Sequence, residues 1–211
     1  MNHQQAWYLQ KMGIDVWLDK NHLPQTPAAN LTWESLRTCV ADCKACDLHK
    51  TRTQTVFGVG NQQADLLLVG EAPGANEDLQ GEPFVGRAGK LLDAILLSIG
   101  LHRKEIFIAN ILKCRPPNNR DPLPEEVNLC THFLHKQIQL LQPKLIVALG
   151  RIAAHFLLAT NTSLTKLRGP IYTYGENKTP LLVTFHPAYL LRSPREKSKA
   201  YDDWLKVKSM I

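Results

Sequence analysis

The chain has 211 residues, of which 44% are hydrophobic and 21% are charged, as is typical of one soluble globular domain with a substantial core. Its formal net charge of +6 and its pI of about 9.1 favour polyanionic partners, because Lys and Arg that neutralise phosphates release condensed counterions. The sequence shows no signal-peptide pattern and no apolar run near the roughly 18 residues that indicate a membrane span. We therefore expect a cytoplasmic protein without a membrane segment.

The amino-terminal stretch, residues 1–30, carries apolar side chains at roughly helical spacing, followed by a proline-containing linker. This pattern predicts an amphipathic helix and linker that stand apart from one domain over residues 31–211. A second helix is expected to begin near Thr32, with Trp33, Leu36 and Val40 on one face. It leads into the first group of cysteines.

Four short apolar runs, each bounded by polar or turn residues, predict buried strands separated by helices. The strands are expected at residues 64–69, 106–110, 145–150 and 181–186, and the helices between them at residues 91–99, 125–141 and 152–158. Alternating strands and helices indicate an α/β fold with a parallel sheet covered on both faces and right-handed crossovers.

The first predicted strand runs into a glycine-rich segment, residues 70–93, with the sequence GEAPGANEDLQGEPFVGRAGKLLD. Its position after a strand and before a helix predicts a site at the carboxyl edge of the sheet. The GEPFVGRA portion approaches a phosphate-binding loop, but Arg87 replaces the required lysine and Ala88 replaces the magnesium-binding Ser or Thr. Carboxylates and Phe84 among the glycines point instead to a pocket for a flat polar ligand.

Five cysteines in a cytoplasmic protein are not expected to form a disulfide framework. Cys43 and Cys46 form a C-x2-C pair, and Cys114 and Cys130 lie further along the chain. Four such thiolates could ligate either zinc or an iron–sulfur cluster, while core packing is the alternative for a lone cysteine. Cys39 is more typical of core packing.

Two later segments also carry polar residues at predicted strand ends. Asn110 precedes a stiff basic loop, residues 115–120, whose arginines are suited to a phosphate backbone. His186 ends the last predicted strand and is expected to face the same crevice as the glycine-rich segment. We expect Leu190 and Leu191, beside several cations, to be exposed and to suit a wedge that enters a base stack.

Three segments, together with four cysteines, resemble the signatures of the family 4 uracil-DNA glycosylases, the iron–sulfur branch of that superfamily. The segments are GEAPGANEDLQGEPFVGRAGKLLD, NILKCRPPNNRDP and HPAYLLR, and the resemblance covers residues 43–211 in matching order. It implies a three-layer α/β/α fold with a central four-stranded parallel sheet. It also implies excision of uracil from single- and double-stranded DNA by hydrolysis of the N-glycosidic bond. A structural 4Fe–4S cluster is expected on Cys43, Cys46, Cys114 and Cys130.

The resemblance further implies roles for individual side chains. The expected catalytic residues are His186, which would donate to uracil O2, and Glu71 and Glu77, which would help to place water. Glu77 would also line the pocket where the methyl group of thymine would clash. Substrate contacts are expected from Gly70, Ala72, Phe84 and Asn110, with Phe84 stacking on the flipped base and Asn110 reading its edge. DNA contacts are expected from Arg115, Leu190, Leu191 and Arg192.

Three alternatives stay open. The first is a DNA-binding module with little turnover, because Ala72 stands where better-known uracil glycosylases carry aspartate. The second is the related branch that traps the abasic sugar covalently, which is disfavoured because residues 86–92 lack an inserted basic, histidine-containing loop. The third, from cysteine number alone, is a zinc protein. We expect a monomer, and a sliding clamp is a candidate partner of the amino-terminal helix.

Overall fold

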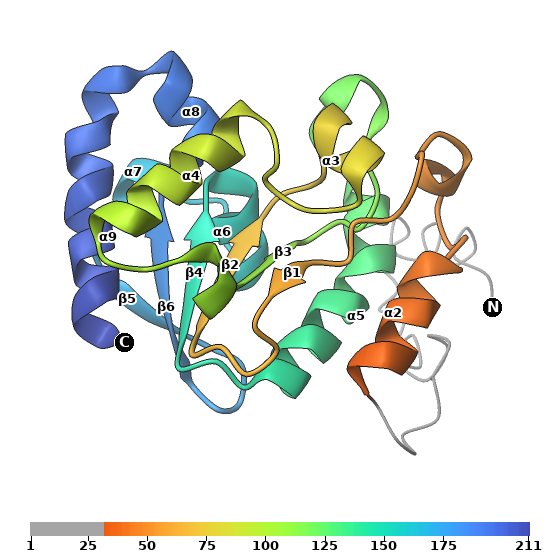
Figure 1. Cartoon of the computed structure of the whole chain (residues 1–211), viewed down its shortest axis with the longest axis horizontal. Helices are drawn as coiled ribbons and strands as arrows, with labels where there is room; N and C mark the ends of the chain where they lie inside the picture. Colours follow the sequence, from red (N-terminus) through yellow and green to blue (C-terminus); the bar gives the residue numbers. More distant parts are fainter. Residues whose placement is uncertain (1–31) are drawn as a thin grey trace, which may run out of the picture. The chain divides into compact units, whose positions relative to one another are not determined.

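The computed structural model describes residues 32–211, so the helix predicted within residues 1–30 lies outside the described part. The described residues contain a six-stranded sheet in the order β1-β3-β2-β4-β6-β5 (Figure 1). The strands are β1 (Val59–Gly60), β2 (Leu66–Gly70), β3 (Phe107–Asn110), β4 (Leu145–Leu149), β5 (Ile171–Tyr174) and β6 (Thr179–Thr184). The helices are α2 (Trp33–Ala41), α3 (Ala75–Gln80), α4 (Arg87–Ser98), α5 (Pro124–Leu141), α6 (Arg151–Leu158), α7 (Leu164–Leu167), α8 (Pro187–Arg192) and α9 (Lys197–Met210).

Four central strands, β3, β2, β4 and β6, pair in parallel, which confirms the predicted parallel sheet and its α/β class. Two short edge strands, β1 and β5, add antiparallel pairs that the sequence did not predict. β1 contains only two residues. The side chains of β5 alternate between exposed and half-buried positions, so neither edge strand forms the continuous apolar run that marks a strand buried on both faces.

Both faces of the central strands are buried, because successive side chains of a strand point to opposite sides. On one face, Leu66 and Leu68 of β2 join Leu92 of α4 and Trp204 of α9 in one apolar cluster. On the other face, Phe107 of β3 meets the ring of Trp33 from α2 at a centroid distance of 4.9 Å. Helices thus cover both faces of the sheet, as the three-layer prediction required (Figure 1).

The helices begin and end close to their predicted bounds, and α2, α4, α5 and α6 confirm the periodicity seen in the sequence. No helix within residues 32–211 combines the length and the apolar character that crossing a bilayer requires. The carboxyl ends of the parallel strands share one edge of the sheet. Gly70, Asn110, Gly150 and His186 lie at or just beyond these ends, so this edge brings the predicted polar residues together.

Candidate active site

A cavity of about 590 Å³ opens at this carboxyl edge. Its lining comes from residues at or just after the carboxyl ends of β2, β3, β4 and β6, and also from α3 and α8. The sequence-predicted residues that it brings together are Glu71, Ala72, Glu77, Phe84, Asn110, His186 and Arg192. Within the described chain, Gly70, Arg115, Leu190 and Leu191 do not line it. The volume and the mixed polar lining suit a small, flat, polar ligand.

Asn110 ends β3 opposite Gly70 of β2, and its side chain is only 2% exposed. Its Oδ1 atom is buried and has no hydrogen-bond partner among residues 32–211. A buried amide oxygen without a partner is costly, so the site is prepared for a ligand that brings a donor. Gly70 is required here, because a Cβ at that position would clash with Asn110 Oδ1 and lie 2.8 Å from the Phe84 ring.

Phe84 supplies an aromatic wall of the cavity, and its side chain is 6% exposed. Its ring centroid lies 5.4 Å from that of His186, with the two planes tilted by 31°. The backbone of Phe84 has φ = +57°, a left-handed conformation that is uncommon for a bulky residue. Gly89 permits this conformation, because a Cβ there would clash with the Phe84 carbonyl oxygen.

Glu77 of α3 ties together the loop that carries Phe84. Its Oε1 accepts hydrogen bonds from the backbone N–H groups of Val85, at 3.0 Å, and Gly86, at 3.1 Å. Its Oε2 accepts from the N–H of Gly74 at 3.1 Å. Both carboxylate oxygens are therefore engaged by the backbone, which gives Glu77 a loop-organising task that the sequence did not indicate.

His186 caps α8, and its Nδ1 accepts a hydrogen bond from the backbone N–H of Ala188 at 3.1 Å. Because Nδ1 acts as the acceptor, the proton of the neutral ring is on Nε2, which is then a donor. The pKa of His186 is lowered to about 4, mainly by burial and also by the charge of Arg192, while Glu77 opposes the shift. His186 is thus a neutral hydrogen-bond donor at neutral pH. Gly150 allows it to approach β4, since a Cβ there would lie 2.8 Å from His186 Cβ.

Glu71 directly follows β2 and lines the cavity. The pKa of its carboxyl is raised to about 7, mainly by burial and also by the charge of Asp121, while Arg151 opposes the shift. Asp121 and Arg151 form an ion pair of 2.8 Å on the cavity lining. A carboxyl group with a pKa near neutrality suits proton transfer. Arg151 follows the carboxyl end of β4. The reasoning that predicted Glu71 and Asn110, that polar residues at the ends of parallel strands meet at one edge, would therefore also have predicted Arg151.

The four predicted ligand cysteines line one small second cavity, to which Arg52 and Lys113 also contribute. Arg52 Nη1 donates to Cys114 Sγ at 3.0 Å, and the backbone N–H of Lys113 donates to Cys130 Sγ at 3.3 Å. The pKa of Cys130 is raised to about 12, mainly by burial, while the charge and the backbone N–H of Lys113 oppose the shift. Within residues 32–211, no three His, Cys, Asp or Glu side chains are grouped tightly enough to hold a single metal ion. Four convergent thiols beside two cations nevertheless fit an iron–sulfur group, whose ligands are thiolates.

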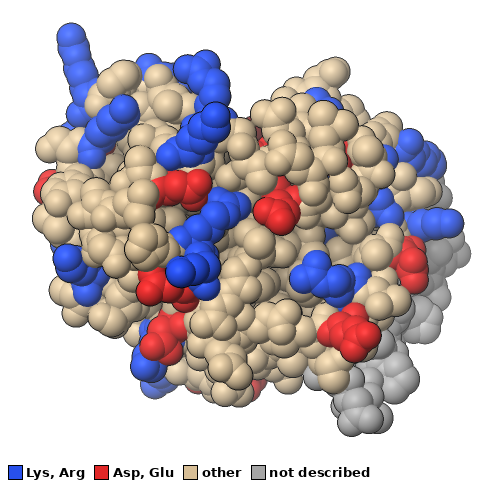
Figure 2. All heavy atoms as spheres, viewed as in Figure 1, with Lys and Arg blue, Asp and Glu red and all other residues tan. Residues whose placement is uncertain are grey.

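The expected exposure of Leu190 is wrong. Leu190 is 0% exposed and belongs to the buried cluster that includes Leu92 and Leu96 of α4, because α8 turns it inward. Leu191 is half-buried, whereas Arg192 is exposed and lines the active-site cavity. Arg115 does not line the cavity within the described chain, but its Nε donates at 2.7 Å to Oδ1 of Asn119, which does line it. Figure 2 shows Lys and Arg side chains gathered over the surface near α4 and α8.

The sequence of this chain is similar to those of known proteins. Residues 57–206 match the model of the uracil DNA glycosylase superfamily. A type-4 uracil-DNA glycosylase of Archaeoglobus fulgidus is 46% identical over 174 residues, covering 80% of this chain and 87% of the relative. One from Thermotoga maritima is 47% identical over 176 residues, covering 82% and 91%, respectively. One from Sulfurisphaera tokodaii is 41% identical over 184 residues, covering 84% of each chain.

Proposed function

This chain belongs to the uracil-DNA glycosylase superfamily, within its type-4 branch, and from that membership we propose how its cavity acts. The protein is a uracil-DNA glycosylase of DNA repair: it hydrolyses the N-glycosidic bond of uracil and leaves an abasic site. The observation that carries the proposed mechanism is the buried Oδ1 of Asn110, which has no hydrogen-bond partner within residues 32–211 and shares its cavity with Phe84 and His186. Phe84 offers a ring on which a planar base can stack, Asn110 offers an amide that can bond to the edge of the base, and His186 offers a hydrogen-bond donor.

Uracil must leave the base stack before any side chain can reach its glycosidic bond. In the proposed complex, the flipped ring stacks on Phe84. The Asn110 amide accepts from uracil N3–H through Oδ1 and donates to O4 through Nδ2. Cytosine presents the opposite pattern at these two positions, so it would leave the buried amide mispaired. Glu77, held by backbone amides, would fix the wall where the methyl group of thymine would clash.

Bond breakage leaves the electron pair of the C1′–N1 bond on uracil, and negative charge spreads to O2. His186 donates from Nε2 to that oxygen. A preorganised donor of this kind contributes about 3–4 kcal/mol to transition-state stabilisation. Water then adds to C1′, and its proton passes to Glu71, whose raised pKa of about 7 suits a general base. Ala72 cannot take this role, so Glu71 is the proposed base.

The proposed cofactor is a 4Fe–4S cluster held by Cys43, Cys46, Cys114 and Cys130, with a structural task. When bound, it would cross-link the segment after α2 to α5 and to the loop after β3. The support is that the four thiols line one cavity beside Arg52 and Lys113, whose positive charges offset those of the thiolates. Zinc remains the competing occupant, and visible absorbance distinguishes the two.

The remaining proposals concern the setting of the reaction. DNA would lie against Arg192, Leu191 and Arg115, and Leu190 is withdrawn from this set because of its burial. We further propose that the enzyme works in the cytoplasm as a monomer, with a sliding clamp as a partner of residues 1–30. The support for the DNA-facing side is the group of exposed cations near α4 and α8 (Figure 2).

The direct test is a gel assay on oligonucleotides with one uracil, in single strands and duplexes, with alkali to cleave abasic sites. Matched oligonucleotides with thymine or cytosine at the same position serve as controls. We expect cleavage only at uracil, without a divalent metal, and its loss in Asn110→Ala. Wild-type protein that binds uracil DNA but never cleaves it would support the non-catalytic module. A DNA adduct that survives denaturation would support the covalent branch.

A further inference from the structure

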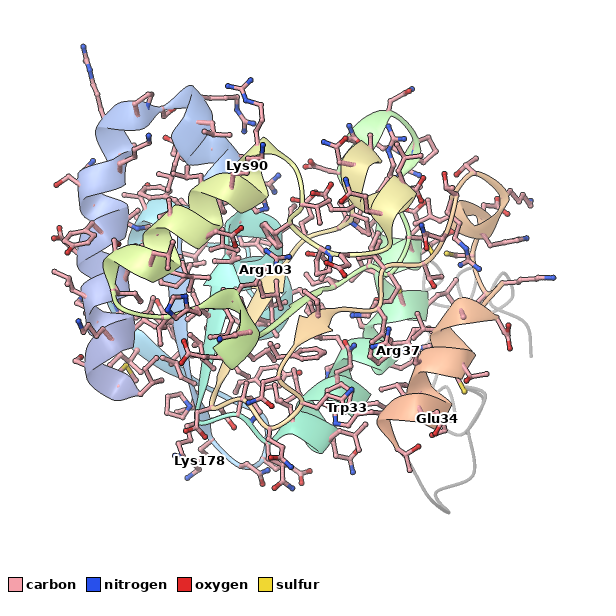
Figure 3. The ribbon with its side chains drawn as sticks, viewed as in Figure 1. Trp33, Glu34, Arg37, Lys90, Arg103 and Lys178 are labelled. Carbon is pink, nitrogen blue, oxygen red and sulfur yellow. The ribbon has the colours of Figure 1, made fainter. Side chains whose placement is uncertain are left out.

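Arg103 lies in a short 3₁₀ turn, η3 (Arg103–Glu105), just before β3, and within the described chain it does not line the active-site cavity. Its guanidinium nevertheless reaches the loop that carries the aromatic wall. Nη1 donates to the carbonyl oxygen of Phe84 at 3.1 Å, and Nη2 donates to the carbonyl oxygen of Pro83. Nη1 also pairs with Asp93 of α4 at 3.2 Å. The Arg103 side chain is labelled in Figure 3.

These contacts meet the strained part of the loop. Phe84 has φ = +57°, and a bulky residue keeps such a backbone only where its surroundings enforce it. Gly89 leaves room for the Phe84 carbonyl but does not hold it. Arg103 does hold it, because one rigid, planar fork binds two successive carbonyl groups. Glu77 binds the N–H groups of Val85 and Gly86 on the other side of the same residue.

We propose that Arg103 is a positioning residue for uracil recognition, which holds the Phe84 ring in its stacking orientation from outside the cavity. This inference rests on the proposed stacking role of Phe84. Without the guanidinium, the carbonyls of Pro83 and Phe84 lose their shared donor, and the Phe84 peptide can relax from the left-handed region. The ring, now 5.4 Å from that of His186, then loses its fixed place beside the base.

The test compares wild type, Arg103→Ala and Arg103→Lys for single-turnover excision and for inhibition by free uracil. We expect Arg103→Ala to lower kcat/KM by about 10- to 100-fold and to weaken inhibition by uracil, because a misplaced stacking platform affects both. Arg103→Lys keeps the positive charge and serves as a control for stability. Because lysine lacks the planar fork, this variant should recover only part of the activity lost in Arg103→Ala. Lys104→Ala, an exposed neighbour in the same turn, should match wild type.

A double-mutant cycle separates positioning from general support of the fold. In a Phe84→Leu background, adding Arg103→Ala should cost less than about threefold, because the ring that Arg103 holds is already gone. The inference is overturned if the two losses multiply, or if Arg103→Ala and Arg103→Lys keep the uracil inhibition constant of wild type. Absence of uracil release by wild type would refute the proposed function itself, which is a distinct result.

Discussion

The pH dependence of uracil release should follow the ionisation of Glu71. Only the ionised carboxylate can accept a proton from water, and burial raises the pKa of this group to about 7. Roughly one hundredth of the enzyme is then active at pH 5, about a tenth at pH 6 and about nine tenths at pH 8. We expect the single-turnover rate to rise about tenfold from pH 5 to pH 6 and to level off above pH 8. His186 stays neutral over this range, because its pKa is lowered to about 4.

Two variants on the cavity lining should move this profile in opposite directions. Asp121→Asn removes the negative charge that raises the Glu71 pKa, so the midpoint should fall. Arg151→Gln removes the positive charge that lowers it and frees Asp121 from its 2.8 Å ion pair, so the midpoint should rise. The assay is single-turnover excision on a uracil oligonucleotide from pH 5 to pH 9. A flat profile, or shifts of the same sign in both variants, would refute Glu71 as the base.

Two further predictions concern the groups that hold the site together. Glu77→Gln should lower the free energy of unfolding by about 1–3 kcal/mol, because three backbone N–H groups lose a charged acceptor. Denaturant titration measures this loss, and equal stability of Glu77→Gln and the exposed control Glu82→Gln would contradict it. Cys114→Ser should abolish visible absorbance in protein purified without oxygen, whereas Cys39→Ser should keep it, since Cys39 lies outside the thiol-lined cavity of the described chain. Colourless wild-type protein with bound zinc would rule out the cluster.

Apolar runs and polar residues at strand ends were enough to predict the central sheet and the edge at which the cavity opens. The parallel strands are buried on both faces, so their sequence signal is continuous, whereas β1 and β5 are short or half-exposed and leave none. Glu71, Asn110 and His186 were found because the carboxyl ends of parallel strands meet at one edge. The burial of Leu190 was missed because α8 is a helix, whose turn decides which of two adjacent leucines faces α4.

The two side chains that hold the loop around Phe84 could not be predicted in the same way. Glu77 and Arg103 act through backbone groups of a loop whose conformation follows no periodic pattern. Their partners are peptide N–H and carbonyl groups, which every residue carries, so the sequence gives no pairing signal for them. The left-handed backbone of Phe84 is likewise set by its surroundings, since nothing in the side chain favours it.

Chromatographic detection of free uracil tests the proposed chemistry most directly. Wild type and His186→Ala are compared on one uracil-containing oligonucleotide, at a pH near 8 where Glu71 is ionised. We expect wild type to release one uracil per strand, and His186→Ala to release it about 100- to 1000-fold more slowly, because the developing charge on O2 loses its donor. Equal rates for the two proteins would contradict the role of His186, and no uracil from wild type would contradict the assigned activity.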